Sequence, residues 1–486
     1  MLGPKQTTWK IIYTHFDGPE RRAVELLNRE VGRRIIRQPG TNILHVLPCE
    51  EETPDTKIDQ NLIIVGTRAE SPLAARFVSA DEVPMGGYAV KVVNAPSNPE
   101  GRIVVITANE SERLPEGAVA FIDDYPARHA PLHGGLQYPD RIFDFDLPPD
   151  LLASTPGFRA RSVFAWGHTL NDYRGYLRDL SRLRMNRLIL WNDVVPLNMP
   201  DIIQTAHAYG IEVFPGFAWG WIDGCANITD ISQKRLDKLR EDVVRNYEEN
   251  YSELGCDGIY FQSFTERGDD TIGGRQIAET VTDFVNATSA DLLQLHPDLK
   301  IEFGLHAPSV RTHLDQIARV DSRVEIVWED CGTFPYNYIP VVHSEEDYLE
   351  AEHFTDQMLD LRPDAPTGLA FKGMATIDWC GGFVNQRGPF ILGDNVPELL
   401  VHDRGLRDDA WRMFSAQWVR YGRYALRLAR HIHEKTQGDC HLCMVGLLDG
   451  GRWLPEALCS EIFWSPLDNW DDLLERVMMR PGLQIG

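Results

Sequence analysis

Residues 161–193 read RSVFAWGHTLNDYRGYLRDLSRLRMNRLILWND and hold one complete strand–helix–strand unit. The apolar runs at 161–167 and 186–193 predict two strands, and the helical spacing of apolar residues at 171–183 predicts a helix between them. The central residues of both strands, VFAW and LILW, are apolar at consecutive positions, which is typical of parallel strands that are buried on both faces. This stretch therefore predicts a βαβ unit.

The same alternation continues to residue 374. Five more strands are expected, at 211–221 (IEVFPGFAWGW), 256–266 (CDGIYFQSFTE), 300–307 (KIEFGLHA), 323–332 (RVEIVWEDCG) and 367–374 (TGLAFKGM). Helices are expected near 199–209, 232–253, 274–295, 309–319 and 344–361. Both 441–448 and 459–464 fit an eighth strand, after a long helix at about 405–435, and 466–481 predicts a final amphipathic helix.

Two architectures fit such a repeat, an open doubly wound sheet and a closed (β/α)8 barrel of the TIM type. An open sheet with a nucleotide site usually has a glycine-rich turn after its first strand, and this chain has none there. Polar and aromatic residues instead end nearly every predicted strand. In a barrel all of these ends meet on one face, where active sites of this fold are built. The sequence therefore predicts the barrel, in the α/β class, over residues 156–486.

The first 150 residues predict a separate, small α+β domain. A helix is expected at 19–36, and strands are expected at 43–47, 62–66, 88–93 and 102–107. Residues 146–158 (DLPPDLLASTPGF) are rich in proline and turn formers, which indicates a linker.

The composition excludes several classes of function. The chain has 486 residues and a net charge of −24, from 48 Lys and Arg against 72 Asp and Glu. Such a surface repels phosphate backbones and anionic lipids, so neither nucleic acid nor a membrane is an expected partner. The N-terminal stretch lacks the apolar core of a secretory signal, and the eight cysteines are sparse and scattered. We therefore expect free thiols and a cytoplasmic protein; a homo-oligomer is compatible with the sequence.

Carboxylates at the ends of two predicted strands are the candidate catalytic groups. Glu266 ends GIYFQSFTE, where partial burial can raise the pKa of a carboxyl group toward that of a general acid. Glu329 and Asp330 end VEIVWED, and strand alternation directs only one of them toward the pocket. Paired carboxylates from different strands suit cleavage of a glycosidic bond, in which one protonates the leaving oxygen and the other attacks, activates water or stabilises positive charge.

Tryptophans and polar residues near the strand ends suggest a sugar subsite. Indole faces stack on sugar rings, and nearby Asp, Asn and His side chains bind hydroxyls. The candidate binding residues are Trp166, His168, Asn192, Asp193, Trp219, Trp221, His306, Trp328, Lys372, Asp378 and Trp379. We expect no cofactor and no metal, although His306 with Glu266, Glu329 and Asp330 leaves a metal-dependent sugar isomerase or lyase as an alternative.

The order of a small α+β domain and a barrel whose strands end in Trp, Asp and Glu resembles two groups of glycoside hydrolases. These are the family 20 β-N-acetylhexosaminidases and, more loosely, the bacterial α-glucuronidases. The segments that carry the likeness are GYAVKVV…RIVVITAN, VFAWG, NRLILWND and IEVFPGF. The resemblance implies an exo-acting enzyme that removes a terminal sugar, with a carbohydrate as its partner.

The fourth predicted barrel strand departs from the hexosaminidase pattern. That family ends the strand in adjacent Asp and Glu, whereas this chain has Thr265 before Glu266. The resemblance therefore implies an acid at Glu266 but gives no support for acetamide-assisted catalysis. The glucuronidase-like layout, with one Glu acid there and a base from a later strand, fits Glu266 with Glu329 or Asp330. A barrel that binds carbohydrate but has lost catalysis is the alternative that the missing Asp leaves open.

Overall fold

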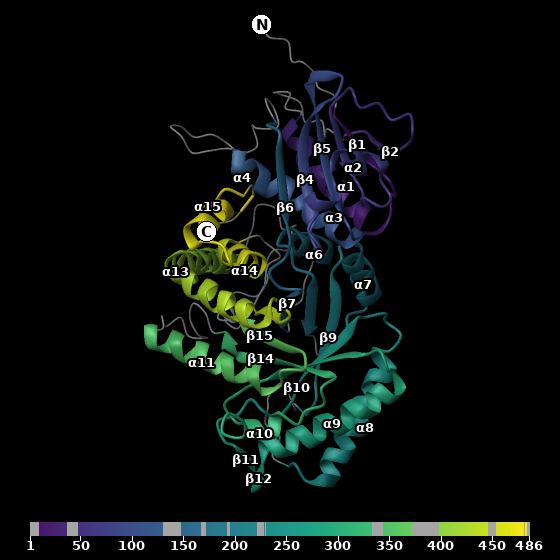
Figure 1. Cartoon of the computed structure of the whole chain (residues 1–486). Helices are drawn as coiled ribbons and strands as arrows, with labels where there is room; N and C mark the ends of the chain where they lie inside the picture. Colours follow the sequence, from purple (N-terminus) through teal and green to yellow (C-terminus); the bar gives the residue numbers. More distant parts are fainter. Residues whose placement is uncertain are drawn as a thin grey trace.

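The computed structural model describes residues 9–35, 47–129, 147–166, 172–191, 195–220, 228, 230–332, 344–371, 398–445, 453–480 and 482–483. Two units follow each other along the chain, an open six-stranded sheet with helices and then a closed eight-stranded barrel (Figure 1).

The first unit is an α+β layer structure. Its sheet has the order β2-β1-β3-β5-β4-β6, in which the first four strands are parallel and β4 and β6 are antiparallel to their neighbours. Its strands are β1 (Lys10–Tyr13), β2 (Cys49–Glu51), β3 (Leu62–Val65), β4 (Tyr88–Ala95), β5 (Asn98–Ala108) and β6 (Asp150–Ser154). Helices α1 (Gly18–Ile35) and α3 (Leu114–Val119) pack on one face and α2 (Pro72–Phe77) on the other, and α4 (Tyr125–His129) follows.

Strand β6 corrects one expectation. The predicted linker at 146–158 contains this edge strand, which pairs with β4 through five residues. Its two leucines are only half-buried and stand side by side, so the segment lacks the alternation by which a strand is recognised. Residues 43–46 of the strand expected at 43–47 lie outside the described residues.

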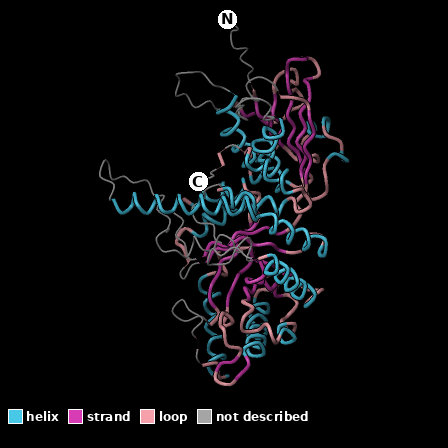
Figure 2. Tube along the Cα trace, turned by 90° about the vertical axis from the view of Figure 1, so that its left-hand side faces the viewer, coloured by secondary structure: helices cyan, strands magenta, loops and turns pink. Residues whose placement is uncertain are grey.

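The second unit confirms the (β/α)8 barrel. Eight parallel strands close in the order β7-β8-β9-β10-β13-β14-β15-β16, and β16 pairs with β7. Figure 2 shows strands in magenta and helices in cyan. They are β7 (Ala160–Trp166), β8 (Arg187–Trp191), β9 (Glu212–Ala218), β10 (Gly258–Gln262), β13 (Lys300–Leu305), β14 (Val324–Gly332), β15 (Thr367–Phe371) and β16 (His441–Val445). A short hairpin of β11 (Thr271–Ile272) and β12 (Arg275–Gln276) follows β10.

The eighth strand is therefore the segment at 441–445, and 459–464 lies in a helix. That helix, α14, is buried at every residue, so it has no amphipathic period and its end reads as a strand. The helices of this unit are α6 (Tyr173–Arg182), α7 (Met199–Ala208), α8 (Gln233–Asn250), α9 (Ile277–Leu295), α10 (Leu314–Ile317), α11 (Glu345–Leu361), α13 (Glu398–Thr436), α14 (Leu454–Trp464) and α15 (Trp470–Met478). No helix in the described ranges is long and apolar enough to cross a membrane.

Strand alternation divides the barrel side chains into two sets. One set fills the interior and includes Phe164, Ile189, Phe214, Tyr260 and Val327. The other set points outward and packs against the helices in the large core cluster. Because interior positions belong to every second residue of a strand, the alternation decides which polar side chains can reach a pocket at the strand ends.

The two units are joined by a buried interface. Tyr88 of β4 stacks on Trp464 of α14 with ring centroids 5.8 Å apart. Next to this stack, the buried guanidinium of Arg184 lies 2.6 Å from Glu461 and 3.1 Å from Asp124 of the first unit. Of these two contacts, the one between Arg184 and Asp124 crosses between the units, so a buried ion pair forms part of their interface.

Candidate active site

Glu329 is a carboxylate buried at the carboxyl end of the barrel strands. It lies near the end of β14 and is 3% exposed. Its neighbour Trp328 packs outward in the core cluster, whereas Val327 belongs to the barrel interior. Glu329 shares the face of Val327 and hydrogen-bonds to interior side chains of β10. The structure thus shows that Glu329 points into the barrel, which strand alternation leaves open in the sequence.

Two neutral side chains of β10 donate hydrogen bonds to this carboxylate. The Tyr260 hydroxyl and the Gln262 amide both donate to Oε1 of Glu329. Strand β13 lies between β10 and β14, and its Gly304 leaves the space for these bonds. A Cβ atom at position 304 would overlap the Tyr260 hydroxyl and lie 2.5 Å from Oε1 of Glu329.

His306 contacts the second oxygen of the carboxylate. It is the first residue after β13, and its Nε2 lies 3.3 Å from Oε2 of Glu329. The imidazole is itself buried, with 6% of its side chain exposed. The structure thus places His306, which the sequence suggests as a sugar-binding residue, beside Glu329.

The surroundings of Glu329 shift the pKa of its phenol donor. Burial, followed by the charge of Glu329, raises the pKa of Tyr260 well above its ordinary value of 10.0, so the phenol stays protonated and donates. Hydrogen bonds to the charged form stabilise that form. A desolvated carboxylate held in this way can stabilise a developing positive charge, act as a base or attack as a nucleophile.

Glu266 has a different environment. It follows β10 by four residues and is exposed, whereas the preceding Thr265 is buried. The Thr265 carbonyl accepts a hydrogen bond from the Ser309 hydroxyl at 2.5 Å, which ties this turn to the segment after β13. The last residue of β10 itself is Gln262, whose side chain points into the barrel.

The structure corrects the expected place of two tryptophans. Trp219 is fully buried against Phe261, with ring centroids 3.6 Å apart, and meets Phe284 of α9 edge-on. Trp328 is 1% exposed and packs edge-on against Phe354 of α11. Both indoles fill the layer between barrel and helices, so neither lines a sugar subsite. Strands that are apolar on both faces hide this distinction in the sequence.

Many of the other candidates lie outside the described residues. These are His168, Asn192, Asp193, Trp221, Lys372, Asp378 and Trp379. Trp166 is the last residue of β7, and Asp330 lies near the end of β14. The structure describes their backbones but not their side chains.

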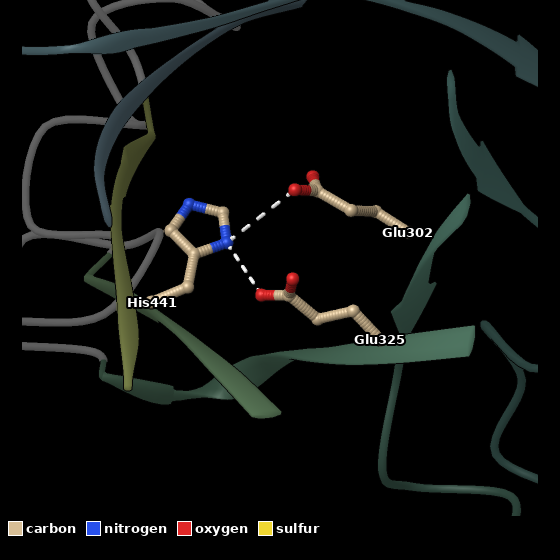
Figure 3. Close-up of side chains that lie close together, drawn as sticks. All are labelled: Glu302, Glu325 and His441. Atoms are coloured by element: carbon tan, nitrogen blue, oxygen red, sulfur yellow. Dashed lines mark hydrogen bonds and ion pairs between the residues drawn. The ribbon is translucent and has the colours of Figure 1, made fainter. Parts of the chain in front are cut away.

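A second, largely buried polar cluster, of Glu302, Glu325 and His441, lies toward the amino-terminal ends of β13, β14 and β16 (Figure 3). His441 at the start of β16 has Nδ1 2.9 Å from Oε1 of Glu325 and 3.6 Å from Oε1 of Glu302. Its Nε2 lies 2.6 Å from the Ser162 hydroxyl. We call these residues, with Arg187, the floor cluster. Burial raises the pKa of Glu302 to about 7.

The floor cluster offers the ligand atoms of a metal site but already contains a cation. One carboxylate oxygen each from Glu302 and Glu325 and a nitrogen of His441 lie within 4.8 Å of one another. However, Nη1 of Arg187 donates to Glu302 and lies 3.8 Å from Oε2 of Glu325. The guanidinium occupies the place that a cation would take, so we interpret this group as structural. In the described part of the chain, no comparable group includes His306 and Glu329.

Comparisons with known proteins identify relatives only by fold. No family model matches this sequence, and no curated protein matches it. Solved glycoside hydrolases do match the structure. A family 115 4-O-methyl-α-glucuronidase is 14% identical, with a TM-score of 0.47, and the match covers 96% of this chain and 57% of that one.

Two further matches are a β-N-acetylhexosaminidase from Bacteroides fragilis and a family 89 glycoside hydrolase from Clostridium perfringens. They are 12% and 9% identical, with TM-scores of 0.42 and 0.46. The matches cover 74% and 85% of this chain and 70% and 50% of theirs. This chain therefore spans little more than half of the glucuronidase and half of the family 89 enzyme. The hexosaminidase and glucuronidase resemblance expected from the sequence is present among the structural neighbours.

Proposed function

We propose that this chain is a glycoside hydrolase that removes a terminal sugar from an oligosaccharide or glycoside. The observation that carries the proposal is the Glu329 carboxylate, held at the carboxyl end of the barrel by the Tyr260 hydroxyl and the Gln262 amide. This is the end at which barrel enzymes place their chemistry. Glycosidic cleavage passes through an oxocarbenium-like centre, which a fixed and ionised carboxylate stabilises.

In this proposal Glu329 is the nucleophile, base or charge stabiliser, and Glu266 is the general acid. The burial expected to raise the pKa of Glu266 is absent, because its side chain is exposed; what supports the role of acid is its place after β10, at the carboxyl end of the barrel. Asp330 is the alternative partner from β14. A β-N-acetylhexosaminidase-like or glucuronidase-like specificity is the finer form of the proposal, and His306 would then contribute to sugar binding.

The test is a panel of nitrophenyl glycosides that includes N-acetylhexosaminides and glucuronides of both anomers. We expect turnover of at least one, loss of that turnover in Glu329→Gln, and no effect of EDTA. Binding of a sugar without turnover across the panel would favour the carbohydrate-binding alternative. Turnover abolished by EDTA would favour the metal-dependent isomerase or lyase.

The roles of the two carboxylates can be separated by the leaving group. A dinitrophenolate leaves without protonation, whereas an alkyl alcohol needs an acid. We expect Glu266→Gln to lose much more activity on an alkyl glycoside than on the dinitrophenyl glycoside of the same sugar. Glu329→Gln should lose activity on both. Equal losses on both substrates in Glu266→Gln would remove Glu266 from the role of acid.

A further inference from the structure

A cleft of about 730 Å³ lies on the outer side of the barrel, where α1 of the first unit meets α6 and α7. Both units therefore contribute to it. Volumes of this size accommodate a small organic ligand. Its lining includes Arg21, Arg22 and Arg29 of α1, Arg174 and Arg178 of α6, and Tyr209 after α7.

The charge of this cleft is opposite to that of the protein. Five arginines line it against three carboxylates, in a chain whose net charge is −24. Guanidinium groups bind carboxylates and phosphates through paired hydrogen bonds. Gathering five of them around one concave surface creates a local positive field that attracts small anions.

The arginines keep donors that their carboxylate partners do not use. Arg21 contacts Glu25 through Nε at 2.8 Å, and Arg22 contacts Glu25 through Nη1 at 2.5 Å. Arg174 contacts Asp201 through Nη2 alone, at 3.1 Å, and 75% of its side chain is exposed. Each pair uses one nitrogen of a guanidinium that carries five N–H groups. Most donor capacity thus remains for a ligand.

Tyr209, the first residue after α7, lies among the arginines of this cleft. The guanidinium of Arg22 lies over its ring, 5.4 Å from the centroid. Burial raises the pKa of the Tyr209 phenol, whereas Arg22, Arg178 and Arg29 each act to lower it, so three cations are close enough to favour negative charge at this point. In addition, Nε of Arg22 is buried without a hydrogen-bond partner among the described residues.

We propose that this cleft binds a compact anion with two or more carboxylate or phosphate groups. A single anionic group would engage one or two of the arginines, whereas several groups on one small scaffold can engage guanidiniums from α1 and α6 together. Such a ligand would bridge the two units. The inference does not depend on the proposed hydrolase activity, since its site and its readout are separate.

The experiment is calorimetric titration of the full chain with pyrophosphate, citrate and digalacturonate at constant ionic strength, with acetate as the single-charge comparison. We expect at least one multivalent probe to bind at least tenfold more tightly than acetate. The variant Arg29→Ala/Arg178→Ala should weaken that binding at least tenfold. Arg174→Gln, whose exposed side chain makes misfolding a small risk, should weaken it as well. The matched control is Arg245→Ala on α8, which should change nothing.

The outcomes separate the sources of the ligand and can overturn the proposal. Binding of digalacturonate alone would indicate that the ligand is an acidic sugar. Binding of pyrophosphate or citrate would indicate a free multivalent anion. Either result supports the proposed anion site. Binding no tighter than that of acetate would overturn it, as would equal weakening in Arg245→Ala. Glu329→Gln should bind the probes normally, so loss of binding in that variant would place them at the strand ends and overturn the proposal.

Discussion

One barrel holds two buried groups of carboxylate and imidazole, one at each end. At the carboxyl end, Glu329 is held by a phenol, an amide and His306. At the amino end, Glu302 and Glu325 share His441 and the full positive charge of Arg187. The two groups contain similar residue types, but only the group at the amino end includes an arginine.

That difference separates a reactive group from a structural one. Neutral donors orient a carboxylate without cancelling its charge, so the charge stays available to a substrate. A guanidinium in contact with the carboxylate neutralises it and leaves little for chemistry. Barrel enzymes place chemistry at the carboxyl ends of strands and stability at the amino ends. Substitutions in one group and then in the other test this contrast.

The largest expected effect is the loss of activity in Glu329→Gln compared with Glu302→Gln. Both replacements remove one buried carboxylate and keep its shape. We expect kcat/KM on the best glycoside of the panel to fall by about 10²–10⁴ for Glu329→Gln, as for loss of a group that acts in the transition state. Glu302→Gln should stay within about threefold of the wild type, because the floor cluster does not reach substrate.

This pair of variants can contradict the contrast directly. Comparable losses of activity in the two variants, with folding confirmed by near-ultraviolet circular dichroism, would mean that the two ends are not functionally distinct. A fully active Glu329→Gln would remove Glu329 from the mechanism.

The second effect is on stability. In Arg187→Met the floor carboxylates lose their cation, and breaking a buried ion pair on one side costs about 3–5 kcal/mol. We expect this decrease in the free energy of unfolding at pH 8, measured with urea. The control is Arg245→Met on α8, whose exposed pair with Asp242 should contribute less than about 1 kcal/mol. An equal decrease in both variants would show that Arg187 has no special role.

A smaller effect is expected when one donor to Glu329 is removed. Tyr260→Phe deletes the phenol hydroxyl and leaves Gln262 and His306 in place. A hydrogen bond to a charged group contributes about 1.5–3 kcal/mol, so kcat/KM should fall by about 10–100-fold. Tyr247→Phe on α8 is the control for removing a buried tyrosine hydroxyl. Unchanged activity in Tyr260→Phe would show that the phenol does not position the carboxylate.

The sequence predicts the barrel better than it predicts the site. Seven of the eight strands fall within predicted runs and β7 begins one residue before its run, because apolar segments with polar ends at regular intervals are a strong signal. Only the eighth required a choice, since the fully buried α14 resembles a strand. The linker predicted at 146–158 contains β6, an edge strand in which no residue is fully buried.

The site depends on which face each side chain occupies, and this is harder to predict. The alternation of Glu325, Val327 and Glu329 does not by itself choose between Glu329 and Asp330, because the strand ends there; the same rule applied to β10 places Tyr260 and Gln262 on one face. It would also have placed Trp328 outward. By contrast, the contact between Glu329 and β10 passes across β13 at Gly304, and no spacing within a single strand encodes such a contact.

The last and smallest effect is a pH dependence of stability from the floor cluster. Burial raises the pKa of Glu302 from its ordinary 4.5 to about 7, so the folded protein holds a proton that the unfolded chain has released in this range. The contribution of Glu302 to stability is complete below pH 4.5 and is lost as the pH rises to 7. One proton limits the slope to about 1.4 kcal/mol per pH unit. Glu325 has a lowered pKa, with burial opposing its His441 and Arg187 partners, so its own contribution changes only at lower pH. Urea unfolding between pH 5 and 7 should therefore show a falling free energy in the wild type relative to Glu302→Gln, and parallel profiles would mean that Arg187 keeps Glu302 ionised throughout.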